Sequence, residues 1–134
     1  MKHYKKVLTI AGSDSGGGAG IQADIKTISA CGCYAMSAIT AITAQNTVEV
    51  SEIHNVPADM VAAQIAAVLE DIGADAVKLG MLPTEASVVA IAGLLKKYEV
   101  TNVVLDPVMV STSGSSLLNP SATNALIQEL VPLC

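Results

Sequence analysis

The sequence contains no Phe, no Trp and no Arg, and only three Tyr among its 134 residues. Without Arg, and with a net charge of −5, the chain cannot form the basic patch that nucleic acid requires, so we expect no nucleic-acid partner. Only 14% of residues are charged and 51% are hydrophobic, which excludes the composition of a disordered chain. The apolar residues are almost all Ala, Val, Ile and Leu, which is typical of helices packed on buried parallel strands.

Long apolar runs are also missing from the sequence. No segment reaches the roughly 18 apolar residues of a membrane-spanning helix, so we expect no membrane partner. Lysines precede the apolar residues 7–11, but this run is too short for the core of a signal peptide. Cys31, Cys33 and Cys134 form an odd set without the spacing of a metal site, which favours reduced thiols and a cytoplasmic location.

Strand and helix patterns alternate along the chain. Strands are predicted at 6–11, 34–44, 48–54, 76–79 and 102–105, and helices at 21–30, 57–71, 84–98 and 120–131. Strands that alternate with helices of roughly 10–15 residues indicate βαβ units and a parallel sheet. Neither an internal repeat nor a linker is visible, so we predict one three-layer α/β unit.

A glycine-rich loop, residues 12–20, separates the first predicted strand from the first predicted helix. Glycines let the backbone approach a ligand closely, and the start of the helix offers N–H groups to an anion or a polar group. The spacing fits neither the dinucleotide fingerprint, which would need glycine at Ile21, nor a P-loop, which would need a lysine. A plain glycine turn is the alternative.

Asp24 is a candidate site residue on the first helix. At 100° per residue it lies beside an apolar stripe formed by Ile21, Ile25 and Ile28. A carboxylate next to a buried face needs a partner or a ligand. The alternative is a carboxylate that only stabilises the first turn through the helix dipole.

Three further candidates each follow a predicted strand: Gln45, Met81 and Asp106. Ligands of open α/β sheets bind outside the carboxyl ends of the strands. Gln45 could pair with a heteroaromatic edge, Met81 could line a flat ring, and Asp106 could lie near a metal or a phosphate. The alternative roles are a turn residue for Gln45, a core methionine for Met81 and an Asp-Pro turn for Asp106. Lys78 lies inside an apolar strand and either pairs with a carboxylate or extends outward.

Four segments, in order, resemble the signatures of the hydroxymethylpyrimidine/phosphomethylpyrimidine kinase family. They are LTIAGSDSGGGAGIQAD at 8–24, SAITAITAQNT at 37–47, KLGML at 78–82 and VVLDPVM at 103–109. The resemblance covers essentially the whole chain. It implies a ribokinase-like three-layer fold with a mostly parallel central sheet, of which residues 1–134 would form the amino-terminal, substrate-binding part.

The resemblance also implies a function and a site. Members phosphorylate the hydroxymethyl group of 4-amino-5-hydroxymethyl-2-methylpyrimidine with ATP and Mg²⁺, and then phosphorylate the monophosphate, in thiamine biosynthesis. The residues that would line the pyrimidine site are Gly12, Asp24, Thr43, Gln45 and Met81. Gln45 would face the aminopyrimidine edge and Asp24 would hold the polar substituents.

The sequence departs from the family in two ways. Residues 110–118 have Thr112 and Ser115 where many members carry charge. Members are also about twice as long, and their later half carries a Gly-x-Gly-Cys anion hole, the catalytic residue and much of the ATP site. We therefore assign no catalytic residue to this chain and expect it to be inactive alone.

Other functions remain open at this point. A pyridoxine or pyridoxal kinase has the same fold, and a pyrimidine-binding module without catalysis would use the same pocket. Because family members often form dimers, a homodimer is the expected assembly.

Overall fold

The computed structural model describes residues 3–109 and 119–134 of the chain. Its strands are β1 (Lys6–Asp14), β2 (Tyr34–Gln45), β3 (Val50–Asn55), β4 (Ala76–Leu79) and β5 (Val103–Leu105). Its helices are α1 (Gly20–Ala30), α2 (Ala58–Asp71), α3 (Glu85–Lys97) and α4 (Pro120–Ala125). Every predicted element is present, and most begin and end within two residues of the predicted bounds.

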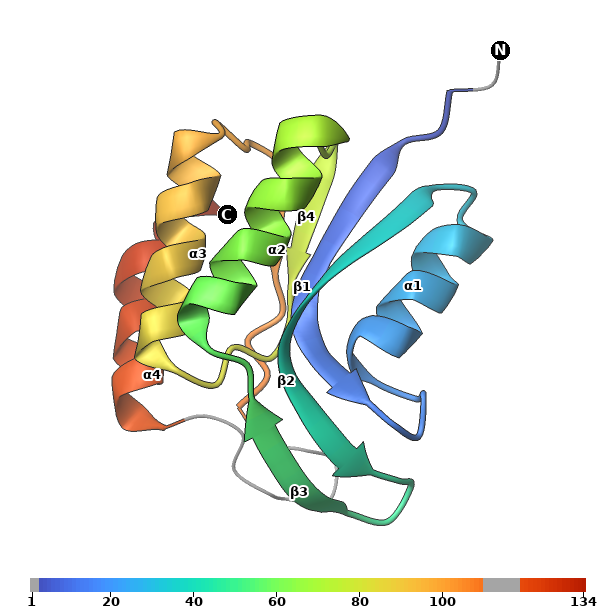
Figure 1. The fold of residues 1–134 in the computed structure, drawn as a ribbon, viewed down its shortest axis with the longest axis vertical. Coiled ribbons are helices and arrows are strands. Elements are labelled where there is room, and N and C mark those ends of the chain that lie inside the picture. The colour runs from blue at the N-terminus through green and yellow to red at the C-terminus, as the bar shows by residue number, and fades with distance from the viewer. Residues whose placement is uncertain (1–2, 110–118) are drawn as a thin grey trace.

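The strands form one sheet in the order β3-β2-β1-β4-β5. β2, β1, β4 and β5 are parallel, and β3 returns antiparallel along β2 at one edge (Figure 1). The mostly parallel sheet that the alternating pattern predicted is therefore confirmed. Because the parallel strands share one direction, their carboxyl ends meet at one edge of the sheet, where ligands of such folds bind.

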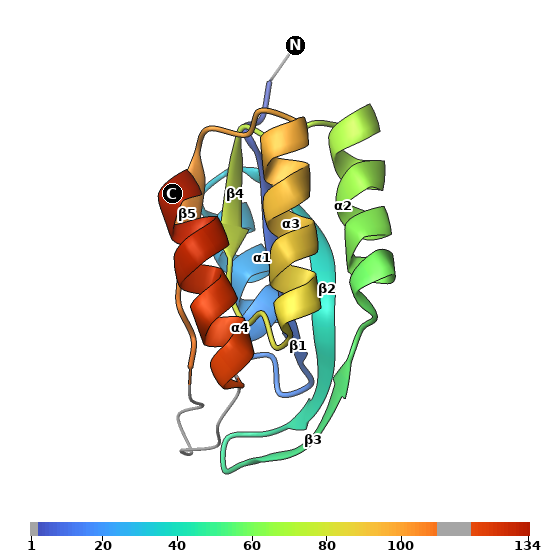
Figure 2. The ribbon, with the colours of Figure 1, turned by 90° about the vertical axis from the view of Figure 1, so that its left-hand side faces the viewer.

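Helices cover both faces of the sheet. α2, α3 and α4 lie on one face and α1 lies on the other (Figures 1 and 2). On the three-helix side, Leu8 of β1 is in register with Met36 of β2 and Val77 of β4, and all three belong to the main hydrophobic core. The next residue of β1, Thr9, therefore points to the α1 side, because successive side chains alternate between faces.

The structure differs from the predicted bounds at two ends. β1 continues through the start of the glycine-rich loop to Asp14, and β2 has one extra residue opposite Gly12, where the register shifts. The last helix is α-helical only to Ala125 and then continues as a π turn and a 3₁₀ turn. Pro132, in the 3₁₀ turn, has no N–H for a regular helical ladder, so the α-helix cannot continue through this residue.

No helix within residues 3–109 and 119–134 is long and apolar enough to cross a membrane.

Candidate functional site

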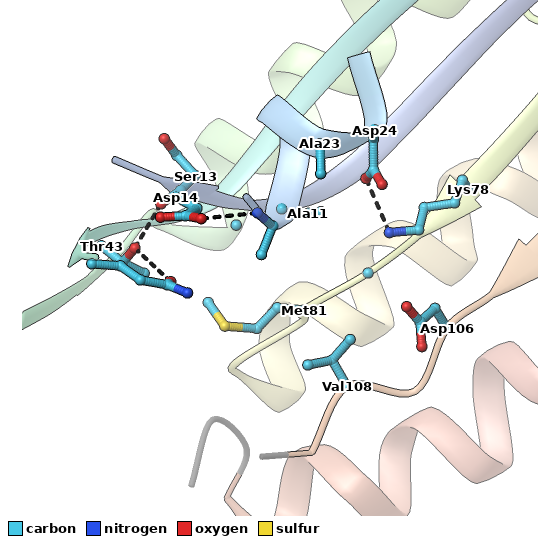
Figure 3. A pocket seen from close by; sticks show the side chains of 15 residues that line it. Ala11, Ser13, Asp14, Ala23, Asp24, Thr43, Lys78, Met81, Asp106 and Val108 are labelled. Carbon is cyan, nitrogen blue, oxygen red and sulfur yellow. Dashed lines mark hydrogen bonds and ion pairs between the residues drawn. The ribbon is translucent and has the colours of Figure 1, made fainter. Parts of the chain in front are cut away.

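A cavity of about 280 Å³ opens at the carboxyl edge of the sheet, between the glycine-rich loop and the ends of β2, β4 and β5. All six residues singled out from the sequence line it: Gly12, Asp24, Thr43, Gln45, Met81 and Asp106. Figure 3 shows four of their side chains on separate elements around the cavity: Asp24 on α1, Thr43 on β2, Met81 just after β4 and Asp106 just after β5. The fold thus brings together residues that lie up to 94 positions apart, from 12 to 106, in the sequence.

Gly12 and Met81 form one wall of the cavity. A Cβ atom added at Gly12 would lie 2.8 Å from Cε of Met81, so a larger residue there would displace the terminal methyl group of this side chain. Met81 is 8% exposed, and its carbonyl oxygen accepts a 2.6 Å hydrogen bond from the buried Thr40 hydroxyl. The main chain of Met81 is therefore fixed, while its polarisable side chain presents an apolar surface.

Thr43 and Gln45 provide the polar wall at the end of β2. Oγ1 of Thr43 lies 2.8 Å from the carbonyl oxygen of Ser13 and 3.2 Å from Oε1 of Gln45. The main chain of Gln45 is held as well, because its N–H donates to Oγ of Ser15 and its carbonyl accepts from the same hydroxyl. The main chain of Gln45 is thus fixed by Ser15, and its side-chain amide lies beside Thr43 with both donors and an acceptor to offer a ligand.

Asp24 has protein partners as well as a place in the cavity. Its Oδ2 atom accepts a 2.6 Å hydrogen bond from Oγ1 of Thr9 and lies 3.0 Å from Nζ of Lys78. Thr9 and Lys78 are direct neighbours in the β1–β4 register, so both reach α1 from the same face of the sheet. The two sequence interpretations of Lys78 are resolved in favour of a carboxylate partner, 54 residues away.

Asp14 is the site residue that sequence reasoning missed. It is 5% exposed, and its carboxylate accepts hydrogen bonds from the N–H groups of Gly16 at 2.7 Å and of Gly18 and Ala19 at 2.9 Å. The carboxylate of Asp14 therefore takes the place of a bound anion at the start of α1, and these three N–H groups are not open to a phosphate. An Asp followed by glycines at the second and fourth positions is the available signal, since Asp side chains bond their own backbone in turns.

Gly20 closes the same loop. It has a φ of +57°, and a Cβ atom there would lie 2.2 Å from the carbonyl oxygen of Gly12. Gln22 ties the start of α1 to β1, because its Oε1 accepts from the N–H of Asp14 and its Nε2 donates to Oγ of Ser13. The glycine-rich loop is thus a tight turn and, at the same time, one wall of the cavity.

Asp106 follows β5 at the mouth of the cavity, and its side chain is exposed. Its N–H donates to the carbonyl oxygen of Leu79, which keeps it next to the end of β4. Within residues 3–109 and 119–134, no group of three or more His, Cys, Asp or Glu side chains could hold a metal ion. The predicted effect of Thr112 and Ser115 lies outside the described residues.

Comparison with known proteins decides the family. Residues 14–134 match the family model described as phosphomethylpyrimidine kinase. The chain belongs to the phosphomethylpyrimidine kinase family. The hydroxymethylpyrimidine/phosphomethylpyrimidine kinase of Rhizobium meliloti is 56% identical over 94% of this chain and 47% of its own length. The chain therefore spans about half the length of this relative, and less of the longer bifunctional relatives.

Solved structures confirm the ribokinase-like fold. A phosphomethylpyrimidine kinase from Clostridium difficile superposes with a TM-score of 0.91 at 52% identity and covers 97% of this chain and 56% of that one. A pyridoxal kinase from Staphylococcus aureus in complex with pyridoxal gives a TM-score of 0.84 at 40% identity, with 98% and 47% covered. Both the pyrimidine and the pyridoxal kinases therefore share this architecture.

Proposed function

We propose that this chain forms the pyrimidine-binding part of a kinase that phosphorylates 4-amino-5-hydroxymethyl-2-methylpyrimidine and then its monophosphate with ATP, in thiamine biosynthesis. One observation carries the proposal: the six residues that the sequence singled out line a single cavity at the carboxyl edge of the sheet. The family to which the chain belongs supports the same reading.

The cavity suits a small, flat, polar-edged ring. Met81 and Gly12 give it an apolar wall, against which a ring can stack. The amide of Gln45, next to Thr43, can donate and accept along the aminopyrimidine edge. Asp24 would hold a polar substituent of the ring.

ATP and Mg²⁺ are part of the proposal. Mg²⁺ is commonly held by one or two carboxylates together with phosphate oxygens and water, and the exposed carboxylate of Asp106 at the cavity mouth fits that role. When bound, the ion would neutralise charge on the phosphates. Asp106 would orient it, and Asp24 and Gln45 would orient the acceptor.

We also propose that residues 1–134 are the amino-terminal, substrate-binding part of one ribokinase-like domain and do not catalyse transfer at a useful rate by themselves. Phosphoryl transfer depends mainly on positioning and electrostatic stabilisation of the transferred group. The backbone donors of the glycine-rich loop at Gly16, Gly18 and Ala19 already serve Asp14. The N–H groups that stabilise the phosphoryl group would then come from residues other than these three.

A pyridoxine or pyridoxal kinase is the second candidate. It is favoured by the structural similarity to a kinase solved with pyridoxal bound. An aminopyrimidine has a ring nitrogen next to an amino group, an acceptor beside a donor that a Gln amide can pair with, whereas the nitrogen of a pyridoxine ring has no donor next to it. The amide of Gln45 therefore favours the pyrimidine. A non-catalytic pyrimidine-binding module would use the same cavity. It would differ from a kinase in one respect, because a longer protein that contains this chain would also have no kinase activity.

The cellular setting is also proposed. Cys31, Cys33 and Cys134 are all free thiols, which agrees with a reducing compartment such as the cytoplasm. Exposed apolar side chains at Val48 and Ile53, on the β2–β3 hairpin, offer surface for the expected homodimer. Sedimentation velocity would test this assembly, and a monomer at all accessible concentrations would contradict it.

Calorimetric titration of the chain with hydroxymethylpyrimidine and with pyridoxine tests the proposal. We expect saturable binding of the pyrimidine that is stronger than that of pyridoxine and is lost in Gln45→Ala. Stronger binding of pyridoxine would favour the second candidate. No binding by a chain that circular dichroism shows to be folded would contradict both.

A further inference from the structure

Lys78 occupies an unusual position for a lysine. It lies within the short strand β4, between the buried Val77 and Leu79, and its side chain is only 25% exposed. A partly buried ammonium is costly unless it has a partner of opposite charge. Its partner is Asp24, and both side chains line the cavity, where Figure 3 shows their charged ends meeting.

The two oxygen atoms of Asp24 have different surroundings. Oδ2 accepts from Thr9 at 2.6 Å and from Lys78 at 3.0 Å, while Oδ1 has no hydrogen bond to any described residue. Within residues 3–109 and 119–134, no buried polar side-chain atom lacks a partner. Oδ1 must therefore be accessible to solvent, although the Asp24 side chain as a whole is only 17% exposed.

The ammonium group of Lys78 lies close over Gly80. A Cβ atom added at Gly80 would lie 3.0 Å from Nζ of Lys78 and 2.8 Å from Cβ of Ala11, so the lysine passes over a position that only glycine leaves open. Thr9 holds the same oxygen from the neighbouring strand. Two donors on adjacent strands thus fix the plane of the Asp24 carboxylate.

We propose that Lys78 is a positioning residue that holds Oδ2 of Asp24, so that Oδ1 becomes the acceptor for one hydroxyl or amino donor of the substrate. This inference rests on the proposed function. It assigns to Lys78 the preference of the site for a ring that carries this donor. A fixed, charged acceptor rejects an analogue without the donor, because the acceptor is then left unpaired.

Removing the ammonium should weaken this selection without removing the cavity. In Lys78→Met the carboxylate keeps only Thr9 as a protein donor and can rotate, so either oxygen can turn to water. The preference for the donor-bearing ligand then falls. Asp24→Asn removes the charged acceptor itself, so adding Lys78→Met to it should change the preference no further.

The test is calorimetric titration of wild type, Lys78→Met, Asp24→Asn, the double variant and Lys96→Met. Lys96 forms a 3.2 Å ion pair with Glu129 away from the cavity and serves as the matched control. The ligands are hydroxymethylpyrimidine and two analogues, one with methyl in place of hydroxymethyl and one without the amino group. Thermal unfolding of each variant separates loss of fold from loss of selection.

We expect wild type and Lys96→Met to prefer the parent ligand over at least one analogue by about tenfold or more. Lys78→Met should lose most of that preference. A preference in Lys78→Met equal to that of wild type for both analogues would overturn the proposal, as would a further loss when Lys78→Met is added to Asp24→Asn.

A second readout does not depend on the ligand. The Asp24 carboxyl carbon, observed by NMR in protein labelled with ¹³C at aspartate, should shift in Lys78→Met and stay in place in Lys96→Met. If wild type binds none of the ligands, the proposed function fails, and this measurement still decides the positioning role. An Asp24 signal that is the same in Lys78→Met and wild type would overturn it.

Discussion

Replacing Asp14 by alanine should destabilise the glycine-rich loop and with it the whole chain. The carboxylate accepts three main-chain N–H groups at 2.7–2.9 Å, from Gly16, Gly18 and Ala19. A hydrogen bond to a charged group contributes about 1.5–3 kcal/mol to stability. These three donor residues are exposed, so water can replace the carboxylate in part. We therefore expect Asp14→Ala to lower the free energy of unfolding by about 2–4 kcal/mol in total.

Urea denaturation followed by circular dichroism measures this change. Asp14→Asn should lie between wild type and Asp14→Ala, because an amide oxygen can still accept while the charge is lost. Asp59→Ala is the matched control, since this exposed first-turn aspartate of α2 accepts one N–H, that of Met60. It should cost less than about 1 kcal/mol. An effect of Asp14→Ala no larger than that of Asp59→Ala would refute the reasoning.

Three further perturbations follow from the site and its scaffold. In Gly12→Ala the added methyl group displaces Met81, so calorimetry should give pyrimidine binding weaker by about tenfold or more. An unchanged affinity would contradict the claim that Gly12 and Met81 form a wall of the pyrimidine site. Gly20→Ala combines a φ of +57° with a clash against the main chain, so urea denaturation should register a loss of about 2 kcal/mol or more; a smaller loss would mean that the loop relaxes. The Lys6 N–H, and then the Lys5 side chain, lower the pKa of Asp75, so this carboxylate stabilises the fold above its unfolded pKa and less as the pH falls below about 4. The free energy of unfolding of Asp75→Asn should therefore depend less on pH below about 4 than that of wild type. The same pH dependence in both proteins would contradict a lowered pKa of Asp75.

Much of the fold could be predicted from the sequence because strong local signals agree with it. The run 103–105 is apolar on both faces, 76–79 is apolar except for Lys78, and Gly32 and Gly73, both with positive φ, end the segments that precede them. Gln45, Met81 and Asp106 each follow a strand of a parallel sheet, and that position alone predicts that they lie at one edge of it.

The remaining features depend on contacts that no local pattern encodes. The direction of β3 is set by its pairing with β2, and its residues alone fit either direction. The partner of Lys78 lies 54 residues away and could be found only once β1 and β4 were adjacent. Asp14 was overlooked because the glycine-rich loop suggested donors for a ligand, whereas the chain uses those donors internally.

The central claim is that a pyrimidine ring binds in the cavity against Met81. The most direct test is NMR of the methionine methyl groups, labelled with ¹³C, during titration with hydroxymethylpyrimidine. We expect the Met81 methyl signal to shift with saturation, because a ring stacked on it changes its local field, while the signals of the buried Met36 and the exposed Met60 stay in place. Saturable binding that leaves the Met81 signal unchanged, or no binding by the folded chain, would contradict the account.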